Sequence, residues 1–179
     1  MILNVVRLDE TAKLPEKAHN GDAGFDLFAL EAVWLNPNDT KVIPTGIGVE
    51  IPYGYFGDLT GKSGLTANTQ LRVQRGIIDH GYTGEVGVIC TNQQSWKYDD
   101  ELFDRMVDLR QNENSVSEEI LDHLMDVEES QRIRIKKGQK IAQLIISPCM
   151  AQANVVERKN FSTDTERGDG GFGSTGTGA

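Results

Sequence analysis

The chain has 179 residues, of which 38% are hydrophobic and 25% are charged, and its formal net charge is −9. This length suits one domain with its own core, and the acidic balance excludes nonspecific nucleic-acid binding, which needs a basic surface. No apolar run reaches the roughly eighteen residues of a membrane span. The N-terminus lacks the basic start and long apolar stretch of a signal peptide, so we expect a cytoplasmic protein.

Short apolar runs recur along most of the chain. Turn sequences such as N-P-N-D, I-P-Y-G-Y and H-G-Y-T-G separate them. Many short strands with regular glycine and proline favour a sandwich or barrel over an α/β fold. The runs that we predict as strands are Leu3–Val6, Val42–Ile51, Gly57–Leu59, Arg75–Ile78, Glu85–Cys90, Arg132–Ile135 and Ile141–Ile146.

The segment from Lys97 to Gln131 differs from the rest in charge and in period. It holds twelve acidic and three basic residues, whereas the remainder carries fifteen of each. Its apolar residues recur at helical spacing in two stretches, and Ser115 with Glu118 fits a capping box that opens the second. We therefore expect a helical hairpin over Asp99–Glu129, inserted between two strands. Two interpretations of its apolar stripe stay open, namely packing against the core and binding a partner protein.

The chain has two cysteines and three histidines, the side chains that most often bind zinc. Cys90 and Cys149 each lie in an apolar run that resembles a strand, so we expect both to be buried, reduced thiols. The histidines show no metal-ligand spacing, which argues against a zinc site.

The chain ends with R-G-D-G-G-F-G-S-T-G-T-G-A, in which six of thirteen residues are glycine. Arg167 offers a fork that matches phosphate oxygens, and Ser174 and Thr175 add hydroxyl donors. Phe172 offers an aromatic face that can stack on a base. We expect this tail to order only on binding and to close as a lid over a nucleoside triphosphate. The alternative is a flexible linker.

Two stretches in the first half of the chain carry groups that suit the same ligand. Asp26 stands in the otherwise apolar A-G-F-D-L, where a carboxylate is costly without donors or a metal. Lys62 and Ser63 lie in G-K-S-G-L, which predicts a tight turn that binds an anion. Taken singly, Asp26 is also explained as a turn cap and Lys62 as a solvated loop cation.

Two further stretches follow. Asp79 and Tyr82 lie in G-I-I-D-H-G-Y-T-G-E, which we interpret as a β-hairpin, and Gln143 lies on a predicted strand in G-Q-K-I-A-Q-L-I. A carboxylate on a rigid hairpin can position and deprotonate a water molecule. Asp79 as a turn cap and Tyr82 as a core residue are the structural alternatives.

Taken in order, these five stretches resemble the five motifs of the trimeric dUTPase family. The most specific matches are A-G-F-D-L, G-I-I-D-H-G-Y-T-G-E and R-G-D-G-G-F-G-S-T-G. The resemblance covers nearly the whole chain apart from the acidic insertion. It implies an all-β fold, a distorted jelly-roll barrel of the β-clip type over residues 1–159. The helical insertion then occupies residues 93–131, and a mobile glycine-rich arm occupies residues 160–179.

The resemblance also implies Mg²⁺-dependent hydrolysis of dUTP to dUMP and pyrophosphate by a homotrimer with shared sites. Asp79 would activate the water that attacks the α-phosphorus, Tyr82 would exclude ribonucleotides, and Asp26 would hold the metal through a coordinated water. Substrate binding is implied for a larger set: Lys62, Ser63, Gly64, Gly76, Ile78, Tyr82, Gln143, Arg167, Gly171, Phe172, Gly173, Ser174 and Thr175.

The chain departs from the family pattern at two places. Lys62 stands where the second motif usually has Arg, and Gln139 with Lys140 stands where the fourth usually has an acidic residue and Arg. Lys keeps the charge but loses the bidentate fork. The insertion resembles segments of some phage-encoded relatives, some of which bind regulatory proteins. This implies a phage origin, action in the host cytoplasm and a second, protein-binding role.

Three other functions compete with dUTP hydrolysis. A dCTP deaminase shares the fold but needs a carboxylate beside the exocyclic amine of the base, and the Asp79–Tyr82 pair fits the hydrolase better. An interaction module would act chiefly through the acidic helices. A structural trimer without activity is disfavoured because every motif keeps its chemical group.

Overall fold

The computed structural model describes residues 2–98, 104 and 118–160. Strands dominate the described chain, as predicted, and two helices accompany them. The strands are β1 Asn4–Arg7, β2 Gly24–Phe28, β3 Val33–Leu35, β4 Thr40–Pro44, β5 Ile47–Glu50, β6 Tyr55–Gly61, β7 Leu71–Val73, β8 Gly76–Ile78, β9 Gly87–Asn92, β10 Ile133–Ile135 and β11 Lys140–Pro148. The helices are α1 Ser63–Asn68 and α3 Glu118–Gln131.

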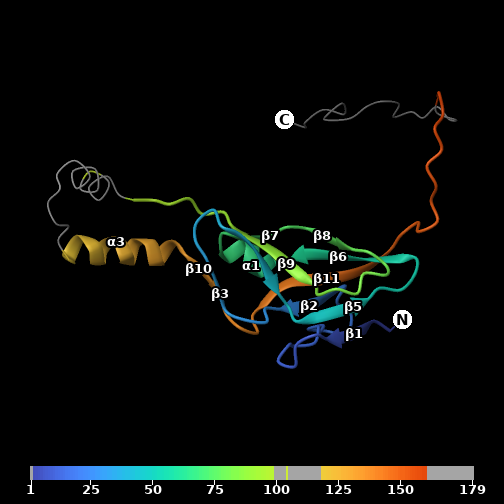
Figure 1. The fold of residues 1–179 in the computed structure, drawn as a ribbon, viewed down its shortest axis with the longest axis horizontal. Helices are drawn as coiled ribbons and strands as arrows, with labels where there is room; N and C mark the ends of the chain where they lie inside the picture. Colours follow the sequence, from blue (N-terminus) through green and yellow to red (C-terminus); the bar gives the residue numbers. More distant parts are fainter. Residues whose placement is uncertain (1, 99–103, 105–117, 161–179) are drawn as a thin grey trace.

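The strands form antiparallel sheets that lie close together in one body (Figure 1) and share one hydrophobic core. A four-stranded sheet has the order β2-β11-β6-β8, and a three-stranded sheet has the order β4-β9-β7. Two further pairs, β1–β5 and β10–β3, complete the barrel. Neighbours in a sheet are often distant in sequence, as β2 and β11 are, which is typical of a jelly roll rather than a meander.

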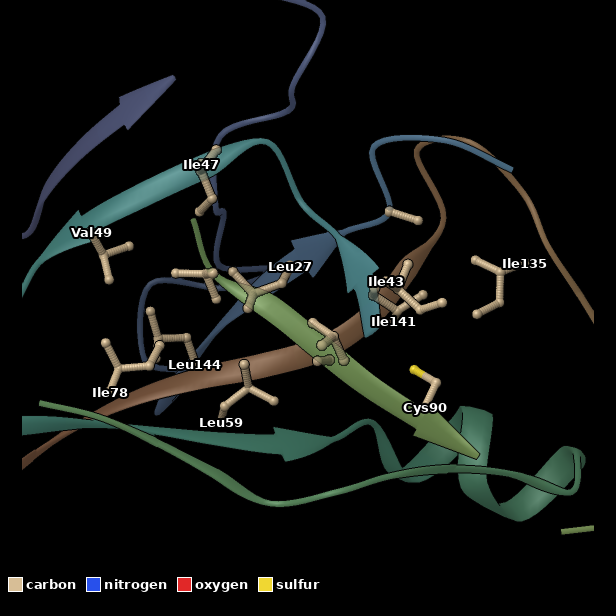
Figure 2. Packing of buried hydrophobic residues seen from close by; sticks show 14 of the residues in the cluster. Leu27, Ile43, Ile47, Val49, Leu59, Ile78, Cys90, Ile135, Ile141 and Leu144 are labelled. Atoms are coloured by element: carbon tan, nitrogen blue, oxygen red, sulfur yellow. The ribbon is translucent and has the colours of Figure 1, made fainter. Parts of the chain in front are cut away.

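Aliphatic side chains from both larger sheets fill the interior (Figure 2). Leu27 of β2, Ile43 of β4 and Leu144 of β11 are each at most 1% exposed. Burying such a side chain stabilises the fold by roughly 1.5–3 kcal/mol. Along β9, buried positions alternate with more exposed ones, so that one face of this strand meets the core.

The predicted strands differ from the observed strands in two ways. The run Val42–Ile51 is two strands, β4 and β5, because Gly46 adopts a φ of +69° between them. A left-handed conformation of this kind favours glycine and turns the chain. The sequence prediction also missed β2, β3 and β7, which are short or carry polar residues on one face.

Two local predictions were wrong. The segment Gly76–Glu85 is not a β-hairpin, because β8 pairs with β6 whereas β9 pairs with β4 and β7. It is a loop that crosses from one sheet to the other. The G-K-S-G-L stretch is not a tight turn either, since Ser63 begins the helix α1 and Lys62 is its N-cap residue.

One of the two cysteine predictions was also wrong. Cys90 is fully buried on β9, and burial raises the pKa of its thiol to about 12. Cys149, in contrast, is exposed, because it follows β11 where the strand leaves the barrel. Both thiols are free, as expected.

The acidic insertion leaves the barrel after β9 and returns at β10, as predicted. The helix α3 lies outside the barrel, beyond the end where β3 and β10 run (Figure 1). The first predicted helix and the Ser115 capping residue fall outside the described residues. In the described part of the chain, no helix has the length and apolarity to cross a membrane.

The two ends of the insertion are fastened to each other by the buried side chain of Gln131. Its Oε1 accepts a hydrogen bond from the Lys97 amide at 2.6 Å, and its Nε2 donates to the Lys97 carbonyl at 2.8 Å. The buried Asn92 donates to the carbonyls of Leu35 and Gln131. These hydrogen bonds connect β9 and β3 to the residues on both sides of the insertion.

Candidate active site

Three side chains from the second and fourth motifs converge on one buried carboxylate of the first motif. Asp26 on β2 is only 2% exposed. Its Oδ1 accepts hydrogen bonds from Lys62 Nζ at 2.6 Å and from Gln143 Nε2 at 3.3 Å. Its Oδ2 lies 2.8 Å from Nζ of Lys140. We call these four residues the Asp26 cluster.

The sheet register explains why these residues meet. Asp26 and Gln143 are directly paired across β2 and β11, so their side chains lie on the same face. Lys62 follows the end of β6, which neighbours β11 on its other side. Lys140 opens β11, and a bulge between it and Ala142 re-aims the start of the strand.

Opposing effects act on the pKa of Asp26. Burial raises the pKa, but hydrogen bonds from Lys140, Lys62 and Gln143 more than offset this, so that the pKa lies below the usual 3.8. The pKa of Lys140 is raised by its hydrogen bonds to Asp26 and Glu16. The carboxylate is therefore ionised at neutral pH, and its charge is compensated by two ammonium groups.

Lys140 is the cluster residue that the sequence analysis did not propose as a site residue. Its Nζ also lies 3.0 Å from Oε1 of Glu16 and 5.7 Å from the centre of the Phe28 ring. The departure of the fourth motif from Arg to Lys was the only sequence signal at this position. The two departures, Lys62 and Lys140, thus meet on one carboxylate.

Among the described residues, the donors around Asp26 fit Mg²⁺ through a coordinated water. In the described residues, no group of three or more His, Cys, Asp or Glu side chains could form a metal cage. Three donors already use the Asp26 oxygens, and a carboxylate has about four acceptor positions. One remaining position fits a water molecule on a Mg²⁺ ion that is held mainly by phosphate oxygens, which is how Mg²⁺ is commonly bound.

The second candidate region is the loop from Asp79 to Glu85, which we call the Asp79 loop. Asp79 is exposed, and its carbonyl accepts a hydrogen bond from the Tyr82 amide at 3.2 Å. Gly81 turns the chain between them with a φ of +86°. The Tyr82 hydroxyl donates to the Glu85 carbonyl at 2.9 Å, and its side chain is 47% exposed rather than part of the core.

Asp26 and Asp79 lie at opposite edges of the four-stranded sheet. Asp26 is on β2, at one edge, and Asp79 follows β8, at the other. Three strand spacings separate these edges, which is about 14 Å. The two regions are also offset along β6, because Gln143 pairs with Thr60 whereas Ile78 pairs with Gly57.

A family model described as dUTPase matches residues 10–98 and 124–176, which is most of the chain. The chain belongs to the dUTPase family. The match leaves out residues 99–123, which form most of the acidic insertion. The jelly-roll architecture and the motif resemblance are both confirmed by this membership.

Bacterial and phage members of the dUTPase family resemble the chain over nearly its full length. The deoxyuridine 5'-triphosphate nucleotidohydrolase of Clostridium kluyveri is 38% identical over 99% of both chains. That of Gloeothece citriformis is 33% identical over 98% of this chain and 97% of its own. A solved structure of the Staphylococcus bacteriophage 80alpha dUTPase with dUPNHPP is 34% identical, with a TM-score of 0.77 and 98% coverage of both chains.

A second solved phage structure bears on the insertion. The dUTPase of S. aureus phage phi11, described as a visualization of the species-specific insert, is 28% identical with a TM-score of 0.70. The similarity covers 92% of this chain and 100% of that one. The dUTPase fold therefore accommodates an inserted segment in that relative.

The remaining predicted site residues divide between the two regions and the arm. Ser63 and Gly64 begin α1 beside the Asp26 cluster, and both are exposed. Gly76 and Ile78 belong to β8, which leads into the Asp79 loop, and Ile78 is buried. The arm residues lie outside the described residues: Arg167, Gly171, Phe172, Gly173, Ser174 and Thr175.

Proposed function

We propose that this dUTPase-family chain hydrolyses dUTP to dUMP and pyrophosphate, which keeps uracil out of DNA and supplies the precursor of dTMP. The observation that carries the proposal is the Asp26 cluster. In this cluster, the carboxylate of the first motif is contacted by side chains of the second and fourth motifs. Two of these contacts come from ammonium groups that are partly exposed to solvent. Side chains of this kind suit a polyphosphate and its metal ion.

Asp79 acts as the general base in this proposal. The oxygen of a water molecule forms a bond to the α-phosphorus as the bond to the oxygen bridging to the β-phosphate breaks. The proton of the water passes to the Asp79 carboxylate, and pyrophosphate leaves. Asp79 suits this role because the carboxylate is exposed on a loop whose backbone is fixed by the Tyr82 amide and by Gly81.

The Asp26 cluster handles the phosphate end of the substrate. Lys62, Lys140 and Gln143 would bind phosphate oxygens, and Asp26 would accept a hydrogen bond from a Mg²⁺-bound water. Mg²⁺ supplies neutralisation of the phosphate charge and polarisation of the phosphoryl group. When a polyanion arrives, the ammonium groups can turn from Asp26 to the phosphates, because their side chains are 27% and 37% exposed.

The active site is shared between copies of the chain in a homotrimer. This part of the proposal is supported by the separation of the two regions. Asp26 and Asp79 belong to sheet edges that are about 14 Å apart, which is more than a single phosphoryl group spans. Val155 and Val156 add support, since they are 100% and 69% exposed just before the arm. Contact with a neighbouring copy of the chain would bury this apolar surface.

Pyrophosphate release with Mg²⁺ tests the proposed reaction, with dUTP, dCTP, dTTP and UTP run in parallel. Release from dUTP alone is the expected result. Turnover of dCTP would instead favour a deaminase-related activity on the same fold, and no turnover of any nucleotide would contradict the enzyme proposal. The expected place of action is the cytoplasm, that of the host if the gene is carried by a phage.

Truncation tests the role of the arm. We expect a chain that ends before Arg167 to remain a folded trimer and to lose most of its activity, because the arm is not part of the core. Analytical ultracentrifugation and dUTP turnover measure the two properties separately. Loss of the trimer on truncation would contradict the lid role.

We also propose that the insertion binds a regulatory protein. The observation that favours this second role is the exposure of apolar residues on α3, where Leu121 is 46% exposed and Met125 is 67% exposed. The related phage 80alpha dUTPase is described as controlling transfer of virulence genes. An exposed apolar stripe on an acidic helix suits a partner with a basic rim around an apolar groove.

Replacing residues 99–129 by a short Gly-Ser linker separates the two roles. Lys97 and Gln131 hold each other directly, so the linker needs to span only a short gap. We expect dUTP hydrolysis to survive and capture of the partner to be lost. A Met125→Lys variant of the full chain should lose partner binding as well, whereas retention of binding in both variants would exclude the insertion as the interface.

A further inference from the structure

The ring of Tyr82 lies directly against the backbone of Gly84. A Cβ atom on Gly84 would stand 2.5 Å from the Tyr82 hydroxyl oxygen, 2.6 Å from Cζ and 3.0 Å from Cε2. Distances this short do not occur between real side chains, so only glycine leaves the ring in place. The Tyr82 hydroxyl is then held by the Glu85 carbonyl.

Glu85 in turn fastens the loop to a fixed part of the barrel. Its Oε1 accepts a hydrogen bond from the Gly46 amide at 2.7 Å. Gly46 cannot shift easily, since a Cβ there would stand 2.8 Å from Ala12 Cβ and 2.9 Å from Leu30 Cδ1. The Val86 amide donates to the Ile47 carbonyl next to it. Tyr82 is therefore positioned through Glu85 by the turn between β4 and β5.

We propose that Gly84 and Glu85 are positioning residues that set the sugar selectivity of the enzyme. They fix the Tyr82 ring at the depth at which it admits a deoxyribose and excludes a ribose. The inference rests on the proposed role of Tyr82 against the sugar. It adds that this selectivity comes from the absence of a side chain at Gly84 and from the carboxylate of Glu85.

The physical effect of a Gly84→Ala change is confined to the ring. The φ of Gly84 lies outside the left-handed region, so alanine adopts the same backbone without strain. Tyr82 is half exposed and can swing outward without disturbing the core. The methyl group therefore displaces the ring and opens space beside the sugar, while the fold is kept.

The test compares kcat/KM for dUTP and for UTP in matched variants. For Gly84→Ala, we expect the dUTP-over-UTP ratio to fall by about tenfold or more, with the melting temperature close to that of the wild type. Gly21→Ala is the control, because a Cβ at Gly21 meets nothing within 4 Å and the residue lies in a different loop. It should leave the ratio unchanged.

Variants of Glu85 supply an independent test if the alanine at Gly84 hinders folding. Glu85→Ala should lower the ratio, because the Gly46 amide loses its acceptor and the loop loosens. Glu85→Gln should restore it, since an amide oxygen accepts the same bond. A ratio that is equally low in both Glu85 variants, or unchanged in Glu85→Ala, would overturn the role of Glu85.

Tyr82→Ala distinguishes failure of the inference from failure of the proposed role of Tyr82. Selectivity that is lost in Tyr82→Ala but kept in Gly84→Ala and Glu85→Ala would overturn the inference alone. Selectivity that survives Tyr82→Ala would overturn both, because the ring would then not read the sugar. Selectivity that falls in Tyr82→Ala, Gly84→Ala and Glu85→Ala and returns in Glu85→Gln would support the inference.

Discussion

The Asp26 cluster and the Asp79 loop are held in place by different physical means. In the Asp26 cluster, a buried carboxylate on β2 is fixed by one ammonium group from the end of β6 and by an ammonium group and an amide from β11. In the Asp79 loop, the groups that fix the chain are backbone hydrogen bonds, glycine conformations and one carboxylate that binds a backbone amide. The first region depends on charge, and the second depends on shape.

The difference follows from the ligand that each region would bind. A triphosphate with Mg²⁺ presents charge, and mobile ammonium groups can follow it over a range of positions. A sugar and a base present shape and directed hydrogen bonds, so a small displacement of the protein is enough to lose selectivity. We therefore expect substitutions in the Asp26 cluster to change binding and stability, and substitutions in the Asp79 loop to change turnover and selectivity.

The largest effect is expected at the centre of the Asp79 loop. Asp79→Asn should lower kcat by about a thousandfold or more, because the amide cannot take the proton of the attacking water. Binding of a non-hydrolysable imido analogue of dUTP should stay close to that of the wild type. Calorimetry and single-turnover kinetics measure the two quantities. Near-normal turnover would remove Asp79 as the base.

The next effect tests the dependence of the Asp26 cluster on charge. Asp26→Asn leaves Lys62 and Lys140 beside an uncharged amide, and losing hydrogen bonds to a charged group should lower the unfolding free energy by about 2 kcal/mol. Urea unfolding measures the loss, and a Mg²⁺ titration of activity should show weaker dependence on the metal. Asp22→Asn, in an exposed turn, is the matched control. An unchanged unfolding free energy in Asp26→Asn would mean that the ion pairs of the Asp26 cluster do not stabilise the fold.

A smaller effect is expected at Lys140. Lys140→Gln should raise KM for dUTP by about tenfold, because one phosphate ligand is lost, and should change kcat less. Lys140→Arg should keep most of the affinity since it keeps the charge. Lys137→Gln provides the comparison, because Lys137 is three residues away and donates to Thr11 instead. An equal rise in KM in Lys140→Gln and Lys137→Gln would mean that the positive charge of this region attracts dUTP, without a specific contact between Lys140 and a phosphate.

The smallest effect concerns the strand that leads into the Asp79 loop. Asp58 on β6 forms a two-point pair with Arg75, at 2.8 and 2.9 Å, just before β8. Hydrogen bonds from Arg75 hold the pKa of Asp58 below 3.8. A lowered pKa contributes stability that is present above 3.8 and is lost as pH falls through the folded-state pKa. The stability difference between wild type and Asp58→Asn should therefore shrink on acidification below 3.8, and a constant difference would contradict it.

The motif chemistry and the all-β class could be predicted from the sequence because both depend on residue type and local period. The strand pairing could not, because β8 and β9 are adjacent in sequence but belong to different sheets. The same limit explains the error at Cys149, whose apolar run does not show where the strand leaves the barrel. Lys140 was missed because its role depends on the bulge that re-aims it, and a bulge has no clear sequence signal.

The hydrogen bonds between Lys97 and Gln131 have a consequence for how the enzyme can vary. Lys97 and Gln131 hydrogen-bond to each other at the base of the insertion. The barrel therefore keeps the same contacts at this position whichever residues lie between them. Loop-closure entropy grows only slowly with length, by about 0.6 kcal/mol for each doubling. Segments of other lengths and sequences can therefore be exchanged at this position, in evolution or by engineering, without altering the hydrolytic machinery that carries them.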